Sequence, residues 1–227
     1  MKKLVLSLIM LVSLASTAQT NTELQKHFEK FYAQMKKQGD IQGVINALTH
    51  LEVMTPSQAR RDTLAYIYVS EGRNLEALNT IGIEKNATDS DINTEVKAIA
   101  LTALNELPKA LEFYEVLFQR KPNPYLAYEI ADLKLQTNDV AGAKEKIEYG
   151  LANVTNDMKR SYYETQQPYQ VSLKAGLTYL KALMLFNEDQ TNNVEKAIVT
   201  LTHALAMDPN FNMAKITKDA LLNKKKE

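Results

Sequence analysis

Small residues recur along this chain at a constant interval, and this interval constrains the fold more than any other feature. A small or branched residue stands every 33 positions from residue 44 to residue 143 and again 54 positions later: Val44, Ala77, Ala110, Ala143 and Ala197. Four positions after each stands a large apolar or aromatic residue: Leu48, Ile81, Tyr114, Ile147 and Leu201. Residues four apart share one face of an α-helix, so the interval indicates a stack of repeated helical units.

The segments between turn signals show helical periodicity. Thr22 and Gln25 have the spacing of a capping box, and apolar residues then recur three or four positions apart up to Met35. Residues typical of turns interrupt the pattern between the expected helices: Gly39, Gly72 and Asn138. The sequence therefore predicts pairs of helices joined by short turns.

The repeated pattern resembles that of tetratricopeptide repeats. In that family a helix–turn–helix unit of about 34 residues has a large–small pair on its first helix, then alanine, a large apolar residue and proline. The corresponding residues here include Leu64-Ala65, Ile99-Ala100, Ile130-Ala131, Pro56, Pro122 and Pro209. The resemblance covers roughly residues 22 to 210, although the chain has no tryptophan and has Lys134 and Lys181 at positions that are usually apolar.

The resemblance implies an all-α fold, namely a right-handed solenoid of about five helical hairpins and a C-terminal capping helix. The expected hairpins span about residues 22–56, 57–88, 91–122, 124–153 and 171–209, and the capping helix spans 211–223. We expect a loop at residues 84–91, and an apolar face on the capping helix formed by Met213, Ile216 and Ala220.

The first residues have the layout of a secretory signal peptide. Lys2 and Lys3 precede an apolar run from Leu4 to Ala15, and small residues follow up to Ala18. We expect cleavage after residue 18, which would place residues 19–227 in the periplasm or outside the cell. An uncleaved N-terminal anchor is the alternative.

The glutamine that follows this expected cut resembles exported proteins of Bacteroidota-type bacteria. The sequence contains no cysteine. We therefore expect neither disulfides nor a cysteine-linked lipid, and no stable membrane insertion once the signal peptide is removed.

No motif in the sequence predicts catalysis, a metal or a cofactor. The sequence lacks the Gly-rich phosphate loop, His-Glu-x-x-His and Gly-x-Ser-x-Gly. The histidines fall on separate predicted helices: His27, His50 and His203. The run Asp89-x-Asp91-x-Asn93 resembles the opening of a calcium loop, but Thr94 and Ala100 stand where such a loop needs glycine and glutamate. We therefore expect a protein that is not an enzyme and needs no cofactor.

The balance of 27 basic and 27 acidic residues, without a basic stripe, gives no reason to expect a nucleic-acid partner. The resemblance instead implies a groove, built from the first helices of the hairpins, that binds another protein or a peptide segment. Candidate contact residues on these helices are Tyr66, Tyr125, Tyr128, Tyr179 and Asp132. The lysine, asparagine and arginine set with which some family members grip a peptide's C-terminal carboxylate does not map onto these positions.

The 54-residue step contains an insertion at about residues 154–170. It contributes three further candidates: Tyr162, Tyr163 and Tyr169. Tyrosine supplies contact area at little cost in conformational entropy, which suits an interface. The alternative for the insertion and for the groove is that the tyrosines simply pack against the helices.

These expectations favour a protein–protein interaction scaffold of the bacterial periplasm or cell envelope that binds a partner segment in its concave groove. Two other functions stay open. One is a structural or self-associating subunit of an envelope assembly, and the other is a glycan- or small-molecule-binding protein. The sequence does not identify the partner.

Overall fold

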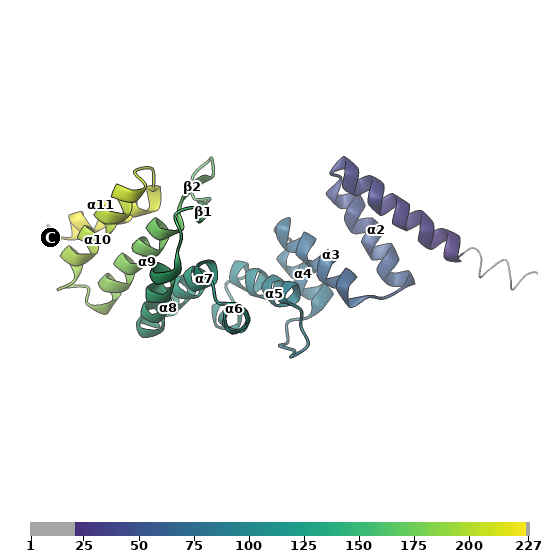
Figure 1. Ribbon diagram of the computed structural model, residues 1–227, viewed down its shortest axis with the longest axis horizontal. Coiled ribbons are helices and arrows are strands. Elements are labelled where there is room, and N and C mark those ends of the chain that lie inside the picture. The colour runs from purple at the N-terminus through teal and green to yellow at the C-terminus, as the bar shows by residue number, and fades with distance from the viewer. Residues whose placement is uncertain (1–20, 226–227) are drawn as a thin grey trace, which may run out of the picture. The chain divides into compact units, whose positions relative to one another are not determined.

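A computed structural model of the chain describes residues 21–225, and the expected signal peptide at residues 1–18 lies outside the described residues. Helices joined by short connections make up most of this part, together with one pair of short strands (Figure 1). The described residues fall into two compact units, the first ending at Ala100 and the second beginning at Leu101. No helix within residues 21–225 is long and apolar enough to cross a lipid bilayer.

The first unit consists of helices joined by short turns, apart from a longer connection between the fourth and fifth of them at residues 82–90. Its helices are residues 21–38, α2 (Ile41–Met54), α3 (Gln58–Ser70), α4 (Asn74–Ile81) and the greater part of α5 (Asp91–Ala103). Gly39 and Gly72 have φ angles of 71° and 72°, a left-handed conformation that glycine adopts at little cost and that reverses the chain between helices. The turns predicted at these two glycines are confirmed.

The second unit contains the remaining helices and both strands. Its elements are α6 (Leu107–Arg120), α7 (Pro124–Gln136), α8 (Val140–Asn153), β1 (Lys159–Tyr162), β2 (Tyr169–Ser172), α9 (Leu173–Glu188), α10 (Val194–Met207) and α11 (Asn212–Lys224). Polar side chains start several of these helices: Asn123 accepts a hydrogen bond from the Leu126 backbone N–H, and Asp139 accepts one from Gly142. Asn138 takes the left-handed turn conformation, with φ of 61°, as its place between α7 and α8 predicts.

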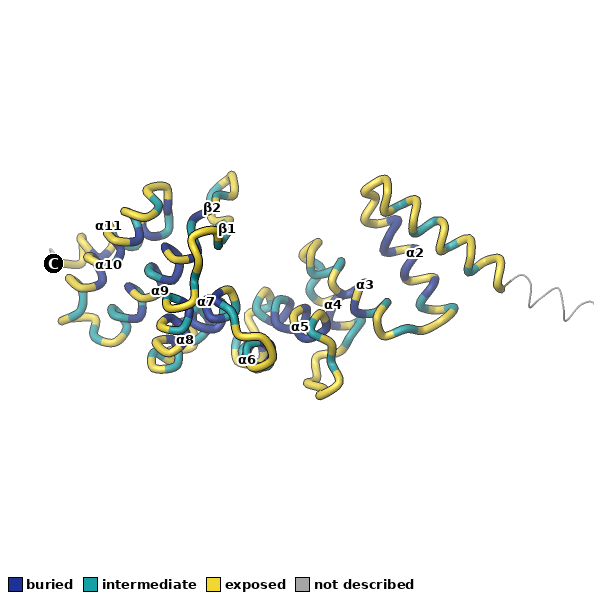
Figure 2. Tube along the Cα trace, viewed as in Figure 1, coloured by how far each residue is buried: buried dark blue, intermediate teal, exposed yellow. Residues whose placement is uncertain are grey.

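The evenly spaced small residues all point into the core. Ala77, Ala110, Ala143 and Ala197 are 0% exposed, and Val44 is 5% exposed. The small members of the large–small pairs are buried as well: Ala65, Ala100, Ala131 and Ala182. Buried positions are dark blue in Figure 2. A side chain of this size lets neighbouring helices approach closely, so the repeat interval is a packing register. The predicted all-α helical-repeat fold is therefore confirmed.

The insertion adds a small β-element to this fold. β1 and β2 pair antiparallel, with Arg160 opposite Val171 and Tyr162 opposite Tyr169. Side chains two apart on a strand share a face, so these four residues form one face of the hairpin, and Val171 on it is fully buried. The expected all-α fold did not include this pair of strands. Each strand is only four residues long, and only β2 alternates aromatic or branched residues with polar ones. Such a pattern is too short to stand out among helical segments.

The last helix buries a different face from the one expected. α11 packs against α10 through Ala214 and Leu221, and Phe211, just before the helix, is fully buried. Ile216 was expected on the apolar face but is 56% exposed. The buried positions 211, 214 and 221 follow the three-and-seven spacing of one helix face, and residue 216 lies off that face.

Candidate functional site

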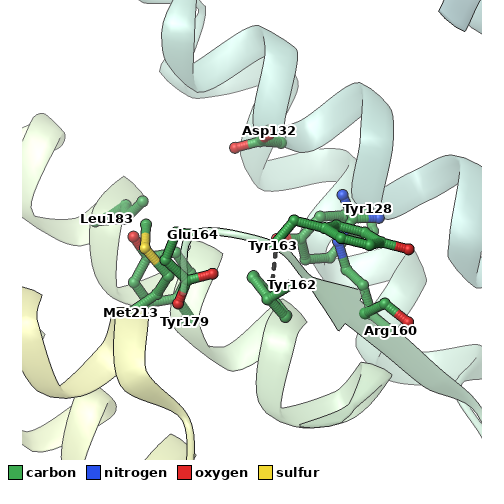
Figure 3. Close-up of a pocket in the computed structure, with 10 residues that line it drawn as sticks. Tyr128, Asp132, Arg160, Tyr162, Tyr163, Glu164, Tyr179, Leu183 and Met213 are labelled. Carbon is green, nitrogen blue, oxygen red and sulfur yellow. Dashed lines mark hydrogen bonds between the residues drawn. The ribbon is translucent and has the colours of Figure 1, made fainter. Parts of the chain in front are cut away.

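Five of the candidate tyrosine and aspartate residues converge on a single pocket in the second unit. Tyr128 and Asp132 come from α7, Tyr162 ends β1 and Tyr163 follows it, and Tyr179 comes from α9 (Figure 3). The pocket has a volume of about 310 Å³, and its other lining residues are Arg160, Ser161, Glu164, Leu183 and Met213. We call this site the tyrosine pocket.

Hydrogen bonds at the start of α9 anchor the hairpin that forms one wall of the pocket. The Ser172 hydroxyl accepts a hydrogen bond from the Ala175 backbone N–H and so caps α9. The same hydroxyl and the Ser172 backbone N–H both donate to Asp208, which follows α10 directly. The Leu173 backbone N–H donates to the Met158 carbonyl at 2.8 Å, on the other side of the hairpin. These bonds tie both ends of the hairpin to the helices that carry the rest of the pocket.

Stacked and hydrogen-bonded aromatic rings form the inner wall. The hydroxyls of Tyr128 and Tyr162 lie 2.9 Å apart in a hydrogen bond, drawn as a dashed line in Figure 3. The Tyr162 ring packs against Tyr169 and Phe211, and the Tyr179 ring packs against Phe211 as well. Burial raises the pKa of both Tyr128 and Tyr162, so these hydroxyls stay neutral at physiological pH.

A glycine on α9 makes room for this wall. A Cβ atom at Gly176 would lie 3.1 Å from the ring of Tyr128 and 3.1 Å from the hydroxyl oxygen of Tyr162. Both contacts are shorter than ordinary van der Waals distances between carbon and these atoms. The missing side chain therefore allows the rings to lie directly on the helix.

Arg160 lies against the same wall and is paired with a carboxylate of the protein. Its guanidinium sits over the Tyr128 ring, 4.0 Å from the ring centroid, and forms a two-pronged ion pair with Glu129. Burial lowers the pKa of Arg160, but the charge and hydrogen bonds of Glu129 outweigh that effect and keep the guanidinium protonated. The positive charge of Arg160 is thus committed to a carboxylate of the protein itself.

Two further carboxylates belong to the pocket and have no basic partner among the described residues. Asp132 is half-buried, and it accepts a hydrogen bond from Gln136 at 3.1 Å. Burial, and then the charge of Glu129, raise the pKa of Asp132, with partial opposition from Arg160. Glu164 accepts hydrogen bonds from the Tyr169 hydroxyl and from Asn212. Burial and the bond to Glu164 raise the pKa of Tyr169 to about 12.

The other three candidates lie outside the pocket. Tyr125 is on α7, 42% exposed, and does not line the pocket, while Tyr66 belongs to α3 in the first unit and is 48% exposed. Tyr169 lies behind the pocket, stacked on Tyr162. The sequence reading missed Arg160, Glu164, Leu183 and Met213 as lining residues. Alternation along β1 would have grouped Arg160 with Tyr162, but no local signal links Met213 to residues so far away in the sequence.

The other motifs of the sequence have structural roles. Asp89 and Asn93, from the calcium-like run, face partners within the first unit: Asp89 pairs with the buried Lys97 at 2.7 Å, and Asn93 donates to Asp62. The ring of His50 stacks on Phe28, and His27 packs edge-on against the same phenylalanine. Residues 21–225 contain no cluster of His, Asp or Glu arranged to hold a metal ion.

Comparison with known proteins shows the fold. No protein-family model matches the chain, and no curated protein matches it. A crystal structure of a tetratricopeptide repeat protein from Parabacteroides merdae is similar, with a TM-score of 0.65 at 16% sequence identity, over 87% of this chain and 72% of that chain. The C-terminal part of a TPR repeat-containing protein from Cytophaga hutchinsonii is similar over 85% of this chain and 69% of that chain, with a TM-score of 0.59 at 14% identity.

A third similar structure is the APC/C hetero-tetramer Cut9–Hcn1. It matches 90% of this chain and 40% of that chain, with a TM-score of 0.57 at 15% identity. Similarity at these identities reflects shared architecture. The chain therefore has the helical-repeat fold of tetratricopeptide repeat proteins, as the sequence resemblance predicted.

Proposed function

We propose that this chain, which has the fold of tetratricopeptide repeat proteins, is a non-catalytic binding protein that holds a segment of a partner protein at the tyrosine pocket. The observation that carries the proposal is the convergence of Tyr128, Tyr162 and Tyr179 from three different elements on one pocket. One of the similar structures is a hetero-tetramer, which supports a role of this fold in protein assembly.

The size of the pocket favours an anchoring side chain over a whole helix. Sites for small molecules typically have volumes of about 300–1,000 Å³, and the tyrosine pocket, at about 310 Å³, is at the lower end. One or two side chains fill such a space. Tyr128 and Tyr179 are already buried and held in place by the protein, so this wall loses little conformational entropy when a partner side chain enters.

The exposed rim suits the rest of the partner segment. Tyr163 follows β1 and is 74% exposed, so its ring can lie on a peptide backbone that passes the mouth of the pocket. Aromatic residues at the centre of an interface commonly account for much of its binding energy. Truncating this ring should weaken binding without disturbing the fold.

A crosslinking pull-down from the native cell envelope tests the proposal. The tagged wild-type chain is compared with Tyr163→Ala and with the matched control Tyr125→Ala, which removes an exposed tyrosine of α7 outside the pocket. We expect Tyr163→Ala to lose a partner that both other chains retain. Equal recovery from all three chains, or no partner from any of them, would contradict the proposal.

A glycan-binding function is the second candidate, and one specific observation favours it. The pocket combines tyrosine rings with the carboxylates of Asp132 and Glu164, and a sugar ring can stack on the former and donate hydroxyl hydrogen bonds to the latter. Saturable binding of a methyl glycoside at the pocket would support this function in place of the protein partner.

We also propose that the protein acts in the periplasm or outside the cell. The support is the signal-peptide layout of residues 1–18 in the sequence. N-terminal sequencing of the protein from fractionated cells tests this, with Gln19 expected as the first residue. Recovery of the uncleaved chain from the cytoplasm would contradict it.

A further inference from the structure

The charges around the tyrosine pocket do not cancel. Arg160 is paired with Glu129, which lies outside the lining of the pocket, so the arginine contributes little net charge to the space. Asp132 and Glu164 then leave the pocket with an excess of negative charge. In Figure 3 the carboxylate of Asp132 points away from Arg160, toward the side on which Leu183 and Glu164 lie.

We infer that the tyrosine pocket binds the cationic end of a lysine or arginine side chain supplied by the partner segment. The inference deepens the proposed function and rests on it. It specifies the chemical class of the anchoring residue, which the fold alone does not indicate.

Unused hydrogen-bond acceptors support a cationic ligand. Asp132 accepts its bond from Gln136 through Oδ2, and Glu164 accepts both of its bonds through Oε1. Within residues 21–225, Oδ1 of Asp132 and Oε2 of Glu164 have no donor. An ammonium group offers three donors and a guanidinium offers five, and neither accepts a hydrogen bond. Such a group would match the lining better than a hydroxyl or an amide.

Both carboxylates line the pocket together with Tyr179. Burial is the main reason that the pKa of Tyr179 is raised, and the negative charges of Asp132 and Glu164 both add to this effect. A cation bound beside Tyr179 would therefore interact with two carboxylates at once. Burial disfavours the ionised form of Asp132, and the bound cation would favour it.

The remaining lining suits the other parts of a long basic side chain. A tyrosine face attracts a cation, and this wall already holds one, since Arg160 lies over Tyr128. Leu183 and Met213 supply apolar surface, against which the methylene stem of lysine or arginine can pack. An acidic side chain would instead meet two carboxylates of its own sign, with the only lining arginine already paired.

Methyl NMR of the purified full chain tests the inference with defined probes. Met213 lines the pocket, so the signal of its ¹³C-labelled methyl group, assigned by its loss in Met213→Leu, reports on occupancy. The probes are the Nα-acetyl amides of lysine, arginine, glutamine and glutamic acid, and methyl α-glucoside. We expect saturable shifts with the lysine and arginine probes, and affinity at least about tenfold weaker for the glutamine probe, since it cannot form the charge-assisted bonds.

Two variants connect binding to the carboxylates. Asp132→Asn keeps an oxygen that can accept the bond from Gln136, and Glu164→Gln alters an exposed side chain, so both should fold. Each variant is expected to bind the lysine probe with about tenfold lower affinity than the wild type. The matched control Asp219→Asn, at an exposed position of α11 outside the pocket, should leave the affinity unchanged. Circular dichroism verifies that each variant is folded.

The outcomes separate this inference from the proposed function. Equal or tighter binding of the glutamine, glutamic acid or glucoside probe overturns the inference, and so does the absence of any saturable shift. Neither result bears on whether Tyr163→Ala loses a partner in the pull-down, which is decided independently. The inference would also be overturned if Asp219→Asn lowered the affinity for the lysine probe as much as Asp132→Asn does.

Discussion

The carboxyl group of Asp132 is held by α7 in surroundings that disfavour its charge. Burial raises its pKa first, and the nearby charge of Glu129 adds to the effect. A group with a raised pKa in the folded state contributes its stability below its unfolded pKa, and that contribution is lost as the pH rises through the folded value. At neutral pH, ionised Asp132 therefore lowers the free energy of unfolding. Residues that cost stability in this way are typical of binding sites.

This cost leads to a prediction for Asp132→Asn. The variant should have a higher thermal midpoint than the wild type at pH 7, because the amide has no charge to desolvate. The difference should shrink as the pH falls toward the ordinary aspartate value of 3.8, where the wild-type residue is protonated as well. Thermal melts followed by circular dichroism at both pH values measure it. A lower midpoint for the variant at pH 7 would contradict the burial argument.

Gly176 is the residue at which α9 meets the tyrosine wall. Valine at this position should lower the free energy of unfolding by about 1–3 kcal/mol, since its branched side chain would press into the rings of Tyr128 and Tyr162. Urea unfolding measures the change. The control is Ala141→Val on the exposed surface of α8, which introduces the same side chain into a helix and should lower the free energy of unfolding by well under about 1 kcal/mol. A substitution at Gly72 would not serve as a control, because Gly72 has a positive φ.

At the scale of elements, the hairpin of β1 and β2 converts a set of helices into a pocket. Two strands of four residues are not stable by themselves. Their position comes from the buried side chain of Val171, from the packing of Tyr162, and from the hydrogen bonds of Ser172 to Asp208. The pocket therefore depends on a junction between the hairpin, α9 and the end of α10.

Ser172→Ala tests this junction. The substitution removes the cap of α9 and the hydroxyl bond to Asp208 together, so we expect a loss of about 1–2 kcal/mol in the free energy of unfolding. Chemical denaturation measures it. Thr178→Ala removes a hydroxyl whose bond lies within the exposed surface of the same helix, and it should change stability by less than about 0.5 kcal/mol. Similar losses for the two variants would argue against a special role for the junction.

At the scale of the whole molecule, stability depends on the packing register of the small residues. In helical-repeat proteins each helical pair buries its apolar surface against its neighbours. The alanines spaced 33 residues apart are fully buried, as such contacts require. A large charged group at one of these positions should disrupt the fold more than the same group elsewhere on the helix.

Ala110→Arg on α6 should therefore lower the free energy of unfolding by several kcal/mol, because the arginine both overfills a fully buried site and buries a charge. Glu112→Arg places the same side chain at an exposed position two residues along the same helix, and it should change stability by less than about 0.5 kcal/mol. Thermal melting compares the two. An unchanged midpoint for Ala110→Arg would refute the register.

The sequence alone determined the helices, their turns and the repeat register. These features depend on short-range chemistry: residues four apart share a helix face, Gly39 and Gly72 permit a left-handed turn, and alanine is small enough for a close contact between helices. The same reasoning selected Tyr128, Asp132 and Tyr179, because they fall on the first helices of predicted hairpins. It could not say which of the candidate residues meet.

Only the tertiary structure decided which of the candidate residues meet. Tyr66 and Tyr128 look alike in the sequence, yet only Tyr128 shares a hydrogen bond with a tyrosine 34 residues further on. Whether the charge of Arg160 is free to meet a ligand depends on its ion pair with Glu129, 31 residues earlier. Met213 reaches the pocket from the last described helix. The excess negative charge of the pocket results from which charged residues pair with one another, and these residues are distant in the sequence. No local pattern predicts it.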